Sequence, residues 1–366
     1  MKRLNGNNII NALAIIMACV IAITGFGCAC VKINNLNGGI TIQLLASTLS
    51  MPQSMPQGFS TVTSSAITTT VADITKPTVS PLPTEPPTTP PTDPSTEITD
   101  DESKYSGEQY PVIEEHFTGT GESFNNFFVK NSTDYSINYN EALNADLGFK
   151  ISNTKEPQVL IVHTHTTESY LINDKGYYYT DYPFRTTDST KNMVAVGNEI
   201  VKSLNKNGIG AIHATEIHDK PTYTGSYDRS AETIYKYLEQ YPNIKVVLDI
   251  HRDAVGYDDE RGKYKPTFTY NGKKAAQIMI MCGYDPYNNY GFGHWQENLN
   301  FALQLQQKAE NLYPGMTRPL YFGDFAYNMY INNGSLLIEV GTETNTLSEA
   351  KYTGELLGNV IAKVLN

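Results

Sequence analysis

The chain has 366 residues, a length that accommodates one large domain and additional segments. Charged residues make up only 18% of it, and its formal net charge is -11. This acidic balance disfavours a role in binding nucleic acid, because contact with a phosphate backbone requires a basic face. A secreted enzyme is compatible with it.

A long apolar segment begins close to the N-terminus. Lys2 and Arg3 precede a run over residues 9–33 in which Lys32 is the first charged residue. About 20 apolar residues suffice for a helix to cross a hydrocarbon core about 30 Å thick. Basic residues before the run favour an N-terminus inside the cell and the remainder outside. We predict a cytoplasmic N-terminus at residues 1–8 and a retained transmembrane helix at 9–33, with a cleaved signal peptide as the alternative.

Residues 34–104 are predicted to be a linker between the membrane and a folded domain. Ser, Thr and Pro dominate this range, most densely between Pro81 and Pro94. Such a composition buries too little apolar surface to offset the loss of chain entropy, and its prolines favour extended conformations. We therefore expect a disordered spacer that lifts the following domain off the membrane.

A globular composition begins at residue 105, and we predict one catalytic domain over residues 105–366 with its core at 156–366. Cys282 is the only cysteine of this domain. An intradomain disulfide is therefore excluded, and so is a zinc site built on two or more of its cysteines. Residues 105–155 show few strong patterns and predict no particular element.

From residue 158 onward, short apolar strands alternate with helical patterns. This alternation predicts an α/β fold, with a largely parallel sheet and helices on both of its faces. The strands are expected at 159–162, 209–213, 245–250, 277–281 and 336–338, and the helices at 192–204, 228–238, 298–312 and 347–364.

Three of the predicted strands run into residues of the types that bind metals. The first strand leads to His165, the third to His251 and the fifth to Glu339. Parallel neighbours bring their carboxyl ends to one edge of a sheet, where ligands bind in open α/β folds. We therefore expect these three residues to meet in a single cleft.

Two histidines and carboxylates in such a cleft are typical of a catalytic zinc site. Zinc takes neutral imidazole and carboxylate ligands, and a catalytic site uses three of them and leaves one position for water. The metal lowers the pKa of that water to about 7 and polarises the carbonyl under attack. A further carboxylate, here Glu339, takes the proton of the water and passes it to the leaving amine.

The first strand leaves the role of His163 open. Residues two apart face the same side of a strand, so His163 and His165 are both candidates for the cleft. The alternative for His163 is a hydrogen-bonded core position. Four further histidines are expected to be surface or packing residues: His116, His213, His218 and His294.

Longer strings in the domain resemble the stage II sporulation protein P family. They are VLIVHTHTTESY, NMVAVGNEI, YDRSAETI, VVLDIHRDA and SLLIEVGTETNTLSEA, and the similarity covers residues 156–366. That family consists of membrane-anchored N-acetylmuramoyl-L-alanine amidases of spore-forming bacteria. The resemblance implies a zinc-dependent peptidoglycan hydrolase in the cell membrane, with its catalytic domain extracytoplasmic.

The family is related to a larger group of zinc-dependent cell-wall amidases, and this relation implies roles for single residues. His165 and His251 take the places of the two ligand histidines, and Glu339 takes the place of the catalytic glutamate. The third ligand, a glutamate in those enzymes, falls on Asp188 in this sequence. Glu168 is an equal candidate, because it follows His165 on the same loop.

The working hypothesis places Zn2+ on His165, His251 and either Glu168 or Asp188. Arg252 is expected to stabilise the developing oxyanion or to orient a substrate carboxylate, for which its planar fork is suited. Glu343 has no counterpart in the related amidases, and its role is left open.

The resemblance further implies a function in sporulation. That function is the thinning of septal peptidoglycan during engulfment, beside stage II sporulation proteins D and M, with an endopeptidase activity as an addition. Two other classes stay open. One is a zinc endopeptidase that cuts only within stem peptides, and the other is a non-catalytic wall-binding module.

Overall fold

The computed structural model describes residues 29–36, 39–46, 100–152 and 154–366, in two units that cover residues 1–88 and 89–366. In the first unit, strands β1 (Ala29–Leu36) and β2 (Gly39–Ala46) form an antiparallel pair. The helix predicted for residues 9–33 therefore does not extend over residues 29–33, and the remainder of the predicted anchor lies outside the described residues.

The expected linker at residues 34–104 also lies largely outside the described residues. Its described parts are the remainder of the β1–β2 pair and residues 100–104, which include the 3-10 helix η1 (Glu102–Lys104). Within the described ranges, no helix combines the length and the apolar composition needed to cross a membrane.

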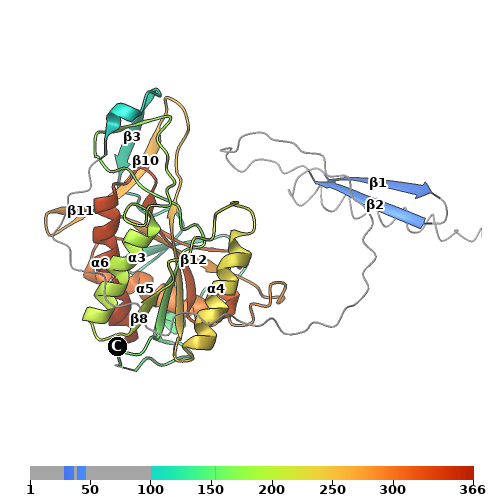
Figure 1. The fold of residues 1–366 in the computed structure, drawn as a ribbon. Helices are drawn as coiled ribbons and strands as arrows, with labels where there is room; N and C mark the ends of the chain where they lie inside the picture. Colours follow the sequence, from blue (N-terminus) through green and yellow to red (C-terminus); the bar gives the residue numbers. More distant parts are fainter. Residues whose placement is uncertain (1–28, 37–38, 47–99, 153) are drawn as a thin grey trace, which may run out of the picture. The chain divides into compact units, whose positions relative to one another are not determined.

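An eight-stranded mixed sheet forms the centre of the second unit (Figure 1). Five of its seven neighbouring strand pairs are parallel, which agrees with the predicted largely parallel sheet; the β4–β5 and β12–β14 pairs are antiparallel. In spatial order the strands are β4 (Glu122–Phe124), β5 (Phe127–Asn131), β13 (Leu320–Gly323), β12 (Ile278–Gly283), β14 (Ser335–Thr342), β9 (Val246–Asp253), β6 (Val159–Val162) and β8 (Ala211–His213).

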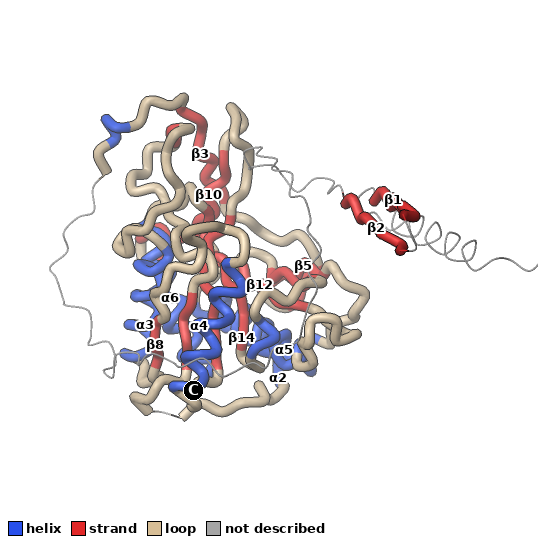
Figure 2. The backbone as a smooth tube through the Cα atoms, turned by 45° about the vertical axis from the view of Figure 1, so that its right-hand side comes forward, coloured by secondary structure: helices blue, strands red, loops and turns tan. Residues whose placement is uncertain are grey.

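Helices cover both faces of this sheet, as predicted. Helices α3 (Met193–Lys206), α5 (Trp295–Leu312) and α6 (Leu347–Leu365) pack on one face, and α4 (Ser226–Gln240) lies on the other (Figures 1 and 2). We call these the α3 face and the α4 face. The short helix α2 (Tyr139–Asn144) adds its buried Ala142 to the core on the α3 face.

Strand alternation divides the apolar residues between two cores. Val159 and Ile161 of β6 belong to the large core on the α3 face, and Leu160 and Val162 belong to a smaller core under α4. The smaller core draws only on β6, β8, β9, α4 and the turns beside them. On the other half of the α4 face, alternation places residues that are at least partly exposed: Lys130, Met279, Tyr321 and Glu339.

A second, four-stranded sheet was not predicted. Its order is β11 (Lys273–Ala276), β10 (Lys263–Tyr270), β3 (Gln109–Glu115) and β7 (Tyr177–Tyr179). Asn271 and Gly272 join β10 to β11 with φ angles of 49° and 72°, the left-handed pair that a two-residue hairpin turn favours. Lys265 of β10 is 1% exposed, and its Nζ lies 3.2 Å from Glu349 Oε1 of α6, which connects this sheet to the main domain.

Candidate metal centre and active site

Strands β6, β9 and β14 bring the predicted site residues together. They are adjacent and parallel, so their carboxyl ends share one edge of the main sheet. Glu339 of β14 lies directly opposite His251 of β9 in the strand register. After β6 ends, a series of turns carries His165 to a position where its ring centroid is 5.1 Å from that of His251.

His251 lies on the α4 face because Leu248 and Ile250 of the same strand enter the opposite core. Its Nδ1 is 3.6 Å from Glu168 Oε2, and its Nε2 is 2.9 Å from Asp249 Oδ1, but this second contact lacks hydrogen-bond geometry. Burial lowers the pKa of His251, yet the charges of Asp249 and Glu168 outweigh it and raise the pKa well above its ordinary value. Without a metal, the two carboxylates therefore favour the protonated form of the ring.

Asp249 is held rigidly behind His251. The backbone N–H of Thr164 donates to Asp249 Oδ1 at 2.8 Å, and the Thr164 hydroxyl donates to Oδ2 at 2.6 Å. A carboxylate fixed in this way behind a histidine orients the ring, an arrangement that commonly supports metal ligands.

Glu168 contacts His251 through one carboxylate oxygen and Arg185 through the other. Arg185 Nη2 donates to Oε1 at 3.2 Å, and Arg185 Nη1 donates to Asp219 Oδ2 at 2.8 Å. Burial would raise the pKa of Glu168, but the neighbouring His251 and the charge of Arg252 lower it to about 2. The carboxylate is therefore ionised at neutral pH, as a metal ligand must be.

His165 is buried beneath an aromatic side chain. The ring of Tyr223 stacks on it with centroids 4.3 Å apart and an interplanar angle of 18°. Its Nδ1 lies 3.3 Å from Ser226 Oγ, and burial lowers its pKa to about 4. The imidazole is therefore neutral at physiological pH, which is the form that binds metals.

A rigid loop holds Tyr223 in this position. Arg229 of α4 donates through its guanidinium to three backbone carbonyls, those of His218, Thr222 and Thr224. Because one planar fork ties these three points together, the loop that carries Tyr223 is anchored on both sides of the ring.

Glu339 differs from the other site residues because its carboxylate has an unused oxygen. Oε2 is buried and has no hydrogen-bond partner among the residues that the structure describes. Burial and the nearby charge of Asp253 raise the pKa of Glu339 to about 8. A carboxyl group whose pKa lies near neutrality is suited to accept and return a proton.

Asp188, the other candidate for the third ligand, is exposed at the surface. Its Oδ1 accepts hydrogen bonds from the backbone N–H and the hydroxyl of Thr190, at 3.0 and 2.7 Å, and Lys191 Nζ lies 3.9 Å from Oδ2. The structure thus brings Glu168, and not Asp188, to the two histidines.

Arg252 is buried, and its guanidinium is engaged inside the protein. It donates to the backbone carbonyls of Ser169 and Phe184 and to Glu343 Oε2, the last at 3.2 Å. Glu343 also pairs with Lys263, 2.6 Å away. These contacts give Arg252 and Glu343 structural roles, and they do not favour the predicted role of Arg252 at the oxyanion.

His163 points into the core on the α3 face, away from His165. Its Nδ1 lies 2.8 Å from the carbonyl oxygen of Ile250, and its Nε2 lies 2.7 Å from Nε2 of His213. Helix α3 approaches so closely that a Cβ atom on Gly197 would lie 2.7 Å from His163 Nε2. His163 is therefore a packed core histidine, because it continues the alternation of β6 whereas His165 follows a turn.

Sequence reasoning gave no role to three residues that complete the site: Asp249, Arg185 and Tyr223. For Asp249 a signal was present, since residues two apart on a strand face the same side and Asp249 precedes His251 by two. Arg185 and Tyr223 lie on loops and carried no comparable signal.

The donor set fits a zinc ion in its chemistry. Two neutral or neutralisable imidazoles and one ionised carboxylate are a common catalytic zinc set. Two ligands of a tetrahedral zinc ion are about 3.3–3.6 Å apart when their bonds measure about 2.0–2.2 Å, and the 3.6 Å between His251 Nδ1 and Glu168 Oε2 matches this spacing. In the described part of the chain, however, no three His, Cys, Asp or Glu side chains are gathered into a complete metal-binding group.

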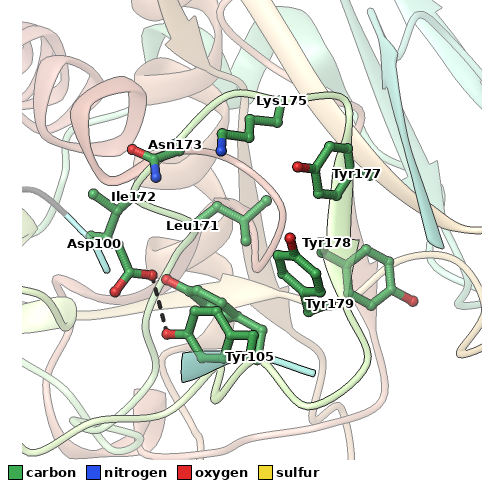
Figure 3. Close-up of a pocket in the computed structure, with 10 residues that line it drawn as sticks. Asp100, Tyr105, Leu171, Ile172, Asn173, Lys175, Tyr177, Tyr178 and Tyr179 are labelled. Carbon is green, nitrogen blue, oxygen red and sulfur yellow. Dashed lines mark hydrogen bonds between the residues drawn. The ribbon is translucent and has the colours of Figure 1, made fainter. Parts of the chain in front are cut away.

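A hollow in the surface lies elsewhere, beside the second sheet (Figure 3). Tyr105, Leu171 and the tyrosines of β7 line it, and the Tyr105 hydroxyl donates to Asp100 at 3.1 Å. His165, Glu168, His251 and Glu339 are not among its lining residues.

Comparison with known families identifies the chain. The family model of Stage II sporulation protein P (SpoIIP) matches residues 87–362 of the 366. The chain belongs to this family. Stage II sporulation protein P of Bacillus subtilis (strain 168) is 31% identical over 217 residues, which are 56% of this chain and 50% of that protein. This SpoIIP-family chain thus spans about half the length of the curated relative it matches.

Solved structures of amidases show a weaker similarity to this SpoIIP-family protein. The N-acetylmuramoyl-L-alanine amidase AmiC2 of Nostoc punctiforme matches with a TM-score of 0.32 and 10% identity, over 57% of this chain and 94% of that chain. An N-acetylmuramoyl-L-alanine amidase from Clostridium difficile 630 matches with a TM-score of 0.32 and 20% identity, over 58% and 95%. At these scores the assignment of the site rests on its own residues.

Proposed function

We propose that this protein is a zinc-dependent peptidoglycan amidase that cleaves the bond between N-acetylmuramic acid and L-alanine. The observation that carries the proposal is the convergence of a His–Glu–His donor set with Glu339, whose buried Oε2 has no hydrogen-bond partner among the described residues, at the ends of three adjacent parallel strands. Membership of the SpoIIP family supports peptidoglycan as the substrate and sporulation as the context.

His165, Glu168 and His251 would hold the metal. When bound, zinc supplies a Lewis acid that activates water and polarises the scissile carbonyl. A metal binds the neutral imidazole, so loading of the site competes with the protonation of His251 that its two carboxylate neighbours favour. Asp249 then orients the ring from behind, and Arg185 keeps Glu168 in place from the other side.

Glu339 is assigned the proton transfers. No hydrogen bond inside the described structure competes for its Oε2, so this oxygen is free to accept a proton from the attacking water. Its raised pKa of about 8 lets the same carboxyl return the proton to the leaving amine near neutral pH. The roles of base and acid thus fall on one side chain.

The cellular setting is part of the proposal. We infer a single-pass anchor in the apolar run before β1, at residues 9–28, and a catalytic domain outside the membrane that thins septal peptidoglycan during engulfment. Stage II sporulation proteins D and M are the proposed partners. This setting is supported by family membership and by the apolar N-terminal run, not by the site geometry.

The decisive experiment replaces Glu339 with Gln. The variant removes the proton acceptor and keeps the three proposed ligands, so we expect hydrolysis to fall by about 10²–10⁴-fold while zinc stays bound. Mass spectrometry of digested peptidoglycan measures the products, and direct metal analysis measures zinc. Glu232→Gln, which changes an exposed glutamate of α4, serves as the matched control and is expected to retain full activity.

Three results would contradict the proposal. A near-normal rate for Glu339→Gln would remove Glu339 from the chemistry. Products cut within the stem peptides, in place of intact peptides released from free lactyl groups, would favour a zinc endopeptidase. If the wild-type chain binds the cell wall but releases no cleavage products in the presence of zinc, the result would indicate a non-catalytic wall-binding module.

A further inference from the structure

A row of aromatic rings leads away from the site across the α4 face. Tyr227 of α4 stacks near His251, with ring centroids 6.4 Å apart and an interplanar angle of 14°. From Tyr227 the contacts continue to Tyr327 at 5.1 Å, from there to Phe325 at 5.2 Å, and from Phe325 to Tyr321 at 5.4 Å. We call these four residues, 227, 327, 325 and 321, the aromatic row.

The aromatic row ends at a positive charge on β5. Lys130 is exposed, and its Nζ lies 5.1 Å from the centre of the Tyr321 ring. The aromatic row therefore starts on α4 beside the site, continues through the loop after β13 and ends next to β5. In Figure 2, β5 and α4 are accordingly separated by β12 and β14.

These rings are not the interior of a core. Tyr327 is 38% exposed, and Tyr321 and Phe325 are partly exposed beside it, with Phe325 resting on the edge of the large core. Tyr327 also has a φ angle of 43°, a left-handed conformation that aromatic residues rarely adopt. Such backbone conformations persist where the surrounding structure holds a side chain for a purpose.

We propose that the aromatic row binds the glycan strand of the substrate on the sugar side of the scissile amide. This inference rests on the proposed function, because it takes peptidoglycan as the substrate. Tyr227 and Tyr327 are stacked with an interplanar angle of 25°, and the two further pairs of the row are tilted by 42° and 43°, so the four rings form one continuous aromatic patch along which an extended ligand can lie. Amphipathic tyrosines offer both an apolar surface and a hydroxyl to a sugar.

The row is continuous with the candidate active site, which favours the substrate itself as the occupant. A glycan strand that lies along the row presents its muramic acid at Tyr227, beside His251. Lys130 at the other end is placed to pair with a carboxylate of a neighbouring stem peptide. A peptide alone is a poorer match, because the row provides ring surfaces in place of the backbone hydrogen-bond partners that an extended peptide uses.

The test measures binding to peptide-free glycan strands. These strands lack the scissile amide, so the wild-type full chain can be used without turnover. The test variant is Tyr327→Asn, because asparagine tolerates a positive φ angle and the change removes only the ring. We expect it to weaken strand binding about tenfold, equivalent to about 1.4 kcal/mol, and to raise KM on intact peptidoglycan to a similar extent, with kcat little affected.

Tyr235→Ser is the matched control, because Tyr235 is 52% exposed on α4 and lies outside the row. It is expected to bind strands as the wild type does. Thermal unfolding of both variants establishes that they fold. The inference is overturned if Tyr327→Asn binds strands normally, or if the wild type binds free stem peptides and not peptide-free glycan. Failure of the amidase assignment itself would appear separately, in the activity of Glu339→Gln.

Discussion

The two faces of the main sheet contain the same types of polar residue and satisfy them differently. On the α3 face, both ring nitrogens of His163 have partners, the Ile250 carbonyl and His213. On the α4 face, His251 Nε2 and Glu339 Oε2 are buried and lack hydrogen-bond partners within the described structure. Most buried polar atoms in folded proteins are paired. Two partnerless atoms on residues that lie opposite each other on β9 and β14 therefore mark the candidate site. Other buried atoms without partners in the described residues, such as Asn298 Oδ1 and Gln306 Oε1 of α5, lie apart from it.

The comparison also indicates a cost. A buried polar group without a partner destabilises the fold by about 1–3 kcal/mol. The α4 face carries two such atoms within one site, whereas both ring nitrogens of His163 on the α3 face are paired. We therefore expect substitutions on the α3 face to affect mainly stability, and substitutions on the α4 face to affect mainly metal binding and catalysis.

The largest contrast is expected between His251→Ala and His163→Ala. His251→Ala removes a proposed ligand, so the purified protein should lose its zinc and its activity. His163→Ala removes only core hydrogen bonds and should keep its zinc, with a loss of about 1–3 kcal/mol in the free energy of unfolding. Metal analysis and thermal unfolding of the two variants make the comparison. Equal zinc loss in both would erase the proposed difference between the faces.

The next effect concerns the choice between two carboxylates. Glu168→Ala is expected to weaken zinc binding by more than about 100-fold, the upper range for residues that merely orient a ligand. Asp188→Ala should leave zinc affinity unchanged, because its carboxylate contacts only Thr190 and Lys191. Competition with a chelator measures both affinities. A stronger effect at Asp188 would indicate that Asp188, and not Glu168, is the third zinc ligand.

The smallest effect is a pH-dependent gain in stability in zinc-free Glu339→Gln. The folded state raises the pKa of Glu339 from 4.5 to about 8, so it binds this proton more tightly than the unfolded state does. The wild type therefore loses stability as pH rises between these two values. One pKa unit corresponds to about 1.4 kcal/mol, and partial exposure screens the charge, so we expect the variant to gain about 1–2 kcal/mol at high pH.

Urea unfolding of the zinc-free wild type and variant, at about pH 5 and about pH 9, measures this gain. The difference between the two proteins should be small at the lower pH and larger at the higher one. A difference that stays constant across this range would mean that Glu339 does not retain its proton in the folded state.

Much of the main sheet could be predicted because its signals are local. Strands β6, β9 and β14 contain runs of buried apolar residues, and α3 to α6 show helical spacing, so their positions follow from short windows of sequence. The convergence of His165, His251 and Glu339 followed from one further assumption, that the three strands are parallel neighbours. The structure confirms this strand arrangement.

The second sheet could not be predicted in the same way. Strand β3 is mostly exposed or partly exposed, and it pairs with β10, so that Val112 lies opposite Lys263 across about 150 residues of chain. Neither strand alone has the alternation of a half-buried strand, and their pairing is visible only after folding. The strands β4, β5 and β13 were not predicted either; they are only three to five residues long, although β5 and β13 are largely buried.

Within the site, the sequence identified candidate residues but not where their side chains point. Whether His163 or His165 enters the site depends on the turn that follows Val162, and no local pattern encodes that turn. Arg252 was assigned to the oxyanion because its partners were unknown. Its acceptors, the carbonyls of Ser169 and Phe184, belong to a loop that is distant in the sequence.

The tight turn between β10 and β11 is a suitable place to insert a label into this protein. A side chain added at Gly272 would meet no other atom within 4 Å, and the turn lies at the opposite end of β10 from Lys263, which pairs with Glu343. A short epitope inserted between Asn271 and Gly272 would therefore project into solvent. It would allow the protein to be followed by microscopy in living cells without fusing a reporter to either end of the chain.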